Sequence, residues 1–90
     1  MKTLKIILSG TVQGVFFRKF IEDKAKNFGL KGFVRNIDDG KVELIIEGED
    51  SKINEMLKIS KQGSPHTKIE KTEIQELQHQ GFSDFKILRI

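Results

Sequence analysis

Apolar and polar residues alternate in several short stretches of the chain, a pattern that is typical of β-strands with one buried face. The first strand is expected at about residues 4–8, and Ser9-Gly10 is expected to end it. The other strands are expected at about residues 30–36, 41–47, 69–77 and 85–87. Alternation is imperfect in the stretch 69–77, and the pattern leaves the face of Leu88 and Ile90 open.

Two other stretches repeat apolar residues at the spacing of an amphipathic helix. The first covers residues 17–28 and stops at Gly29, which predicts a left-handed C-terminal cap. The second covers residues 53–60, and either Asp50 or Ser51 is expected to cap its start. The chain therefore runs strand, helix, strand, strand, helix, strand, with a short terminal strand.

This order of elements restricts the topology. Asp38-Asp39-Gly40 is typical of a tight turn, so the second and third strands are expected to form a hairpin. Right-handed crossovers then place both helices on the same face of one sheet. We therefore predict an α+β fold, a ferredoxin-like βαββαβ sandwich with an antiparallel sheet, two helices on one face and a short extra C-terminal strand. Residues 1–90 are expected to form a single domain.

Composition narrows the classes of protein. The chain has 90 residues, of which 37% are hydrophobic, enough for one modest core. The absence of Cys excludes a disulfide scaffold, a Cys-based zinc site and a thiol nucleophile, and it fits the cytoplasm. No apolar run approaches the roughly 18 residues of a membrane helix, and no signal peptide pattern is visible. We expect a cytoplasmic protein that has no membrane partner.

The balance of charges is compatible with a small anionic ligand and does not require nucleic acid as a partner. There are 16 basic and 13 acidic residues, so the net charge of +3 is a mild surplus. Neither His66 nor His79 has a carboxylate at the spacing of a metal ligand, so we expect no metal and no cofactor. Nothing in the sequence demands a dimer, and a monomer is expected.

The stretch from Gly10 to Arg18 leaves a strand and enters a helix. Gly10 and Gly14 bracket the turn, and successive backbone amides there can converge on an anion. A cation in the first turn of a helix interacts unfavourably with the positive end of the helix dipole. A bound anion that contacts the Arg18 guanidinium would offset this cost. This planar guanidinium suits two phosphate oxygens. The alternative interpretation is a surface loop with an exposed Arg.

A second polar constellation surrounds Asn36, which is expected just before the hairpin turn. Asn commonly occupies such positions for its own backbone hydrogen bonds, and that is the plain alternative. Arg35 is expected on the opposite face of the strand, in a solvated surface.

At these two places the sequence resembles the acylphosphatase family. The stretch Gly10-x-Val12-Gln13-Gly14-Val15-x-Phe17-Arg18 reproduces the family's first signature without a departure. The second signature is met by Gly32-Phe33-Val34-Arg35-Asn36, three residues, Gly40-x-Val42, five residues and Gly48. Phe33 is often Trp in the family. The resemblance also covers length, element order and the late Phe85-x-Ile87, so it spans essentially the whole chain.

The resemblance implies hydrolysis of small acyl phosphates to a carboxylate and inorganic phosphate, without a metal. It assigns phosphate binding to the Arg18 guanidinium and assigns water orientation to the Asn36 side chain. It also assigns phosphate binding to the backbone amides of the loop residues Gln13, Gly14, Val15, Phe16, Phe17 and Arg18. These residue types are chemically adequate, because phosphoryl transfer needs mainly positioning and charge stabilisation. The sequence does not select the acyl group.

Two rival functions remain as alternatives. An RNA-binding module shares the element order, and Lys31-Gly32-Phe33 begins like an RNP1 motif. The following residues depart from that motif, and few aromatics are left to stack on bases, so we expect no nucleic-acid partner. The other rival is a phosphate-sensing or regulatory domain without turnover. The presence of Asn36 beside Arg18 speaks against it, because a binder has no need to position water.

Overall fold

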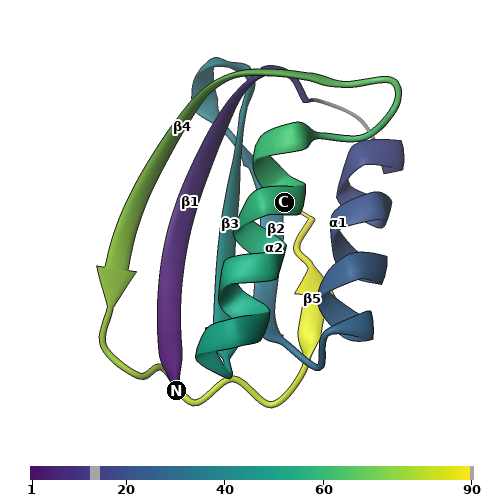
Figure 1. The fold of residues 1–90 in the computed structure, drawn as a ribbon. Helices are drawn as coiled ribbons and strands as arrows, with labels where there is room; N and C mark the ends of the chain where they lie inside the picture. Colours follow the sequence, from purple (N-terminus) through teal and green to yellow (C-terminus); the bar gives the residue numbers. More distant parts are fainter. Residues whose placement is uncertain (13–14, 90) are drawn as a thin grey trace.

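The computed structural model describes residues 1–12 and 15–89, which form a sheet covered by two helices on one face (Figure 1). The two helices are α1 (Val15–Asn27) and α2 (Asp50–Gln62). The five strands are β1 (Lys2–Thr11), β2 (Lys31–Ile37), β3 (Lys41–Gly48), β4 (Lys68–Leu77) and β5 (Phe85–Ile87). Their order across the sheet is β4-β1-β3-β2-β5, and the predicted ferredoxin-like fold with its extra C-terminal strand is confirmed.

The strand pairing sets the positions of the later site residues. β1, β2, β3 and β4 pair antiparallel, and β2 and β3 form the predicted hairpin, with Asn36 opposite Val42. The hairpin turn is Asp38–Gly40, in which Asp39 and Gly40 both have positive φ. β5 joins the edge beside β2 in the parallel sense, so the sheet is mixed.

The helix ends show one confirmed prediction and one error. The N–H of Gly29 donates to Lys26 and that of Leu30 donates to Ala25, and Gly29 has φ 69°. This is the left-handed Schellman cap expected from the sequence. The predicted N-cap of α2 was wrong: the cap residue is Glu49, whose carbonyl accepts from Lys52 and Ile53. No side-chain hydrogen bond caps this helix, so the preference for Asp or Ser at such positions does not decide where it begins.

The end of the first strand was also predicted too early. β1 continues through Ser9 and Gly10 to Thr11, and its register with β4 shifts between Ser9 and Gly10. Gly10 has φ 133°, and a Cβ there would overlap the carbonyl oxygen of Lys68 on β4. The glycine therefore marks a bulge with close backbone approach rather than the end of the strand.

The core lies between the sheet and the helices and joins every layer. Its central residues have little or no exposed surface, and they come from β1, α1, β2, β3, α2 and β5 and from two positions in the connections, Val12 and Leu30. They are Leu4, Ile6, Leu8, Val12, Phe17, Ile21, Ala25, Leu30, Val34, Val42, Leu44, Ile46, Ile53, Met56 and Phe85. Among the described residues, no helix is both long and apolar enough to cross a membrane.

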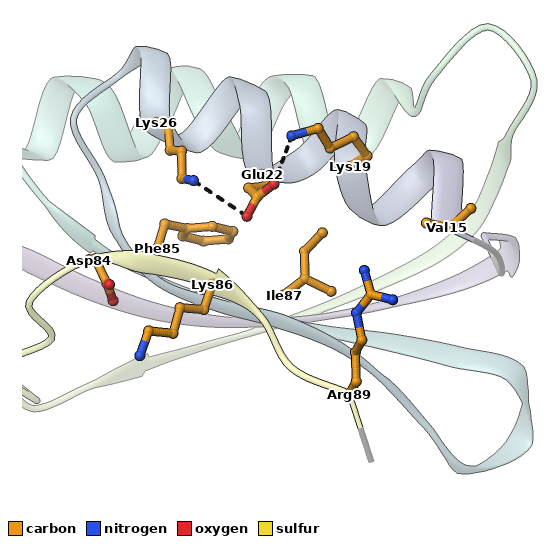
Figure 2. Close-up of a pocket in the computed structure, with 9 residues that line it drawn as sticks. All are labelled: Val15, Lys19, Glu22, Lys26, Asp84, Phe85, Lys86, Ile87 and Arg89. Carbon is orange, nitrogen blue, oxygen red and sulfur yellow. Dashed lines mark hydrogen bonds and ion pairs between the residues drawn. The ribbon is translucent and has the colours of Figure 1, made fainter.

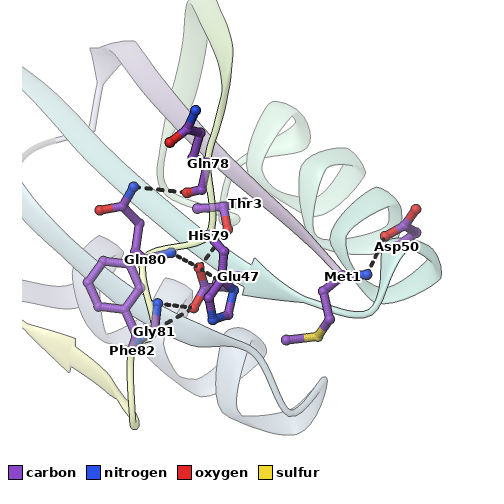
Figure 3. Close-up of polar contacts among 9 residues, drawn as sticks. All are labelled: Met1, Thr3, Glu47, Asp50, Gln78, His79, Gln80, Gly81 and Phe82. Atoms are coloured by element: carbon purple, nitrogen blue, oxygen red, sulfur yellow. Dashed lines mark hydrogen bonds and ion pairs between the residues drawn. The ribbon is translucent and has the colours of Figure 1, made fainter.

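A buried carboxylate ties the connection between β4 and β5 to the sheet (Figure 3). Glu47 on β3 is 2% exposed, and its Oε2 accepts hydrogen bonds from Thr3 Oγ1 and from the backbone N–H of Gln80, both at 2.6 Å. Its Oε1 accepts from the N–H groups of Gly81 and Phe82 at 3.0 and 3.1 Å. Burial opposes the charge, but these donors prevail and lower the pKa of Glu47 to about 2.

Candidate functional site

Arg18 reaches the site from the beginning of α1. The helix starts at Val15, and Phe17, which is 1% exposed, packs its first turn against the core. Arg18 follows Phe17 and is half-buried, and its Nε atom is buried. Among the described residues this Nε has no hydrogen-bond partner. A buried donor without an acceptor costs free energy, so Arg18 is a candidate for binding a ligand that supplies an acceptor.

Asn36 reaches the same region from β2. Val34 and Asn36 are two residues apart on a strand and therefore face the same side, and Val34 is fully buried beneath the helices. The Oδ1 atom of Asn36 is buried and has no partner among the described residues. In the alternative role of a turn residue, Oδ1 would accept a hydrogen bond from the hairpin backbone, and within residues 1–12 and 15–89 it accepts none.

Arg35 lies on the opposite face of the sheet, as the alternation predicts. Its Nε donates to Glu43 Oε1 at 2.7 Å, and its guanidinium lies 5.7 Å from the centre of the Phe33 ring. The Arg35 side chain is 37% exposed, in agreement with a position on the solvated surface. The two adjacent residues of β2 therefore have separate roles, and only Asn36 faces the helices.

One cavity of about 300 Å³ is lined by Arg18, Asn36, Leu88 and Arg89. The structure thus brings together the two side chains that the sequence singled out. Leu88 and Arg89, which follow the last strand, were not predicted from the sequence to be site residues. The inward positions Phe85 and Ile87 were visible as an alternation, but the pattern could not show where the chain goes after β5 ends.

The predicted loop residues divide between two environments. Gln13 and Gly14 lie outside the described residues. Val15 and Phe16 belong to the first turn of α1 and are exposed, by 46% and 88%, whereas Phe17 is buried. The first N–H groups of a helix have no acceptor within the helix, and together with the dipole they favour an anion at this end. The first turn contains no Asp or Glu that would oppose such an anion.

The described side chains do not form a metal-binding cluster. Within residues 1–12 and 15–89, no group of three or more His, Asp or Glu side chains is arranged to hold a metal ion. The cavity itself combines a cation, an amide and the exposed Arg89, a donor set that suits an anion. The arrangement can therefore hold an anionic group against Arg18 while an amide faces it from β2.

Comparison with known proteins agrees with this geometry. The sequence profile described as Acylphosphatase matches residues 4–87. An acylphosphatase of Bacillus pumilus (strain SAFR-032) is 43% identical over 82 residues, which cover 90% of this chain and 91% of the relative. An acylphosphatase of Acaryochloris marina (strain MBIC 11017) is 41% identical over 86 residues, which cover 96% of this chain and 92% of the relative.

The fold of this chain is also similar to that of a solved acylphosphatase structure. The crystal structure of acylphosphatase from Bacillus subtilis superposes with a TM-score of 0.94 at 36% sequence identity. The match covers 99% of this chain and 100% of that chain. The similarity therefore includes the sheet, both helices and the strand β5 that carries the chain to the cavity.

Proposed function

The chain belongs to the acylphosphatase family, and on that premise we propose that the cavity between Arg18 and Asn36 is its active site. Acylphosphatases are hydrolases that act on acyl phosphates, and this chain is a hydrolase of the same class of substrate. One observation carries the assignment: Arg18 Nε and Asn36 Oδ1 are buried, lack partners among the described residues, and belong to side chains that line one cavity. A substrate supplies the missing partners.

Arg18 binds the phosphoryl group in this proposal. The guanidinium offers a rigid fork of N–H donors, which can contact two phosphate oxygens at once. The backbone amides between Gln13 and Arg18 complete the phosphate-binding loop, and the free N–H groups at the start of α1 support this role. Arg18 and the amides also stabilise charge on the transferring group in the transition state.

Asn36 orients the attacking water. A side-chain amide does not titrate usefully, so Asn36 cannot serve as a general base. Its Oδ1 can accept a hydrogen bond from water and point the oxygen lone pair at phosphorus, and a phosphate oxygen takes the proton. The P–O bond to the acyl group breaks, and the leaving group is a carboxylate whose conjugate acid has a pKa of about 4. Such a group departs without protonation.

This chemistry requires no metal, and we propose metal-independent hydrolysis. Full activity after dialysis against excess EDTA is the expected result; loss of activity that returns with a divalent cation would contradict it. We further propose that residues 1–90 act as one domain, as a cytoplasmic monomer without nucleic-acid or membrane partners. The absence of Cys supports a reducing compartment. Light scattering of the purified protein would test the monomer.

The site assignment is tested by competition. Inorganic phosphate, as product, should compete with benzoyl phosphate, and amide signals of residues 15–18 should shift on its addition. The variant Arg18→Ala should lose both effects, whereas Lys24→Ala, which removes the same charge later on α1, should keep them. Phosphate binding that survives Arg18→Ala, or noncompetitive inhibition, would refute the cavity as the active site. p-Nitrophenyl phosphate serves as the ester control, and because its leaving group is poorer it should react far more slowly.

A further inference from the structure

A groove of about 560 Å³ runs between α1 and β5 and adjoins the proposed active site (Figure 2). Arg89 lines both this groove and the smaller cavity that contains Arg18 and Asn36. Figure 2 shows the Arg89 guanidinium directed toward the first turn of α1, near Val15 and Ile87. The two hollows therefore share one cationic side chain.

The topology places this groove along β5, whereas Asn36 belongs to the neighbouring strand β2. The sheet order has β2 next to β5 at the edge, and α1 packs on both strands. Asn36 approaches from β2, whereas the groove lies along β5. In phosphoryl transfer the attacking and leaving oxygens lie roughly in line through phosphorus. In the proposed mechanism, a water held by Asn36 attacks from the β2 side, so the acyl group leaves on the side of the groove.

The charges along the groove are unequal. Glu22 on α1 is flanked by Lys19 and Lys26, whose Nζ atoms lie 3.1 and 3.5 Å from its two carboxylate oxygens. Lys19 Nζ also lies 3.2 Å from Asp23 Oδ1, so two carboxylates of the same helix balance the two lysines. Within residues 1–12 and 15–89, Arg89 forms no ion pair, and Asp84 lies at the far end of the groove from it (Figure 2). The end nearest the active site is thus cationic.

We propose that the Arg89 end of the groove is a subsite for the acyl group, and that it favours acyl phosphates whose acyl part carries a second anionic group. This inference rests on the proposed function, because the phosphoryl group must sit at Arg18. Arg89 is here a specificity-determining residue, since its charge acts on the part of the substrate that does not react. The guanidinium can contact a carboxylate through two N–H donors.

Two substrates of equal shape test the proposal. 4-Carboxybenzoyl phosphate and 4-carbamoylbenzoyl phosphate have the same ring and length, and they differ in the charge of the distal group. The measured quantity is the ratio of kcat/KM for the carboxylate to kcat/KM for the amide, at low ionic strength because salt screens exposed charges. The wild-type ratio is expected to exceed one. A ratio at or below one would overturn the proposal.

Variants then assign the preference to Arg89. Arg89→Gln should lower the ratio about fivefold, as expected for one exposed ion pair, and Arg89→Lys should restore part of it. The matched control is Lys86→Gln, which removes the same charge from β5, but from a side chain that points away from α1 (Figure 2). It should change the ratio less than twofold. An unchanged ratio in Arg89→Gln, including an equal loss on both substrates, would overturn the subsite.

The outcomes remain separable from failure of the active-site proposal. Arg18→Ala should abolish turnover of both substrates. If Arg18→Ala stays active on both, the assignment of the active site fails, whatever the effect of Arg89→Gln. If Arg18→Ala is inactive and Arg89→Gln keeps the wild-type ratio, only the acyl subsite fails.

Discussion

Glu47 and Asn36 lie toward opposite ends of the β2–β3 ladder, and both bury polar side-chain atoms. Glu47 pairs with Lys31 at the beginning of β2, while Asn36 lies five positions later, which is about 16 Å along a strand. The oxygens of Glu47 accept four hydrogen bonds from the protein, three of them from consecutive residues of the β4–β5 connection. Asn36 Oδ1 accepts none among the described residues.

Under the proposed function, the difference separates a group that stabilises the fold from two groups that bind the substrate. A charged group with complete hydrogen bonding stabilises the native state, and its loss exposes unpaired donors. Arg18 Nε and Asn36 Oδ1 lack such hydrogen bonds among the described residues, so their desolvation costs free energy, which the proposed substrate would recover. Substitutions at the two ends should therefore have different effects. Changes at Glu47 should lower stability, and changes at Arg18 and Asn36 should lower activity.

The largest effect is expected for Arg18→Ala. The change removes the charge that holds the phosphoryl group in both ground state and transition state, so kcat/KM should fall on the order of 10³-fold. Arg18→Lys should also be impaired, because a point charge cannot replace the guanidinium fork. The melting temperature should stay constant or rise, since a buried unpaired donor is removed. A clear fall in Tm would remove the contrast with Glu47.

Asn36→Ala should affect turnover more than binding. Its amide acts on the attacking water, so kcat should fall by about 10²-fold while phosphate affinity changes little. Asn54→Ala, an exposed amide on α2, is the control and should keep wild-type kcat. Thermal unfolding measured alongside shows that each variant is folded at the assay temperature. Near-normal kcat in folded Asn36→Ala would leave catalysis to Arg18 and the loop amides alone.

Much of this architecture could be predicted from local sequence. The alternation of apolar residues, the Asp38-Asp39-Gly40 turn and Gly29 gave the hairpin, the helices and their order, because these signals depend on neighbours in the chain. The β1 bulge could not be predicted, since Gly10 is required by the backbone of β4, which lies far away in sequence. That Arg18 and Asn36 belong to one site was expected only from the family resemblance, and the structure places both side chains around one cavity.

Glu47 and Arg89 show what local patterns conceal. Glu47 occupies an alternate strand position, where a charged residue indicates a solvent-facing side chain, yet it is buried. Its partners are backbone N–H groups of residues 80–82, and no sequence pattern indicates that this segment folds over β3. Arg89 follows the end of a three-residue strand, and its place in two hollows depends on the path of the chain after β5.

Glu47→Gln is expected to lower stability and to spare turnover. One carboxylate oxygen becomes an NH₂ group, which must face either the N–H of Gln80 or those of Gly81 and Phe82. Donors facing donors should reduce the free energy of unfolding by about 2 kcal/mol. Urea unfolding measures this loss, and kcat at a temperature where the variant is folded should stay within about twofold. A large fall in the kcat of the folded variant would show that Glu47 also affects the active site, and the separation of the two regions would then be wrong.

The smallest expected effect is the pH dependence of the free energy of unfolding in acid. Burial raises the pKa of Glu47, but the Thr3 hydroxyl, the backbone amides and the nearby His79 outweigh it and lower the folded-state pKa from 4.5 to about 2. A lowered pKa means that the unfolded chain binds the proton more tightly, so this stabilisation is complete above about pH 5 and is lost as the pH falls toward 2. The difference in unfolding free energy between wild type and Glu47→Gln should therefore shrink from pH 7 to pH 3. Glu70→Gln, which changes an exposed carboxylate on β4, corrects for general charge effects. A gap that stays constant with pH would show that the geometry of the hydrogen bonds, rather than the charge of Glu47, holds the β4–β5 connection.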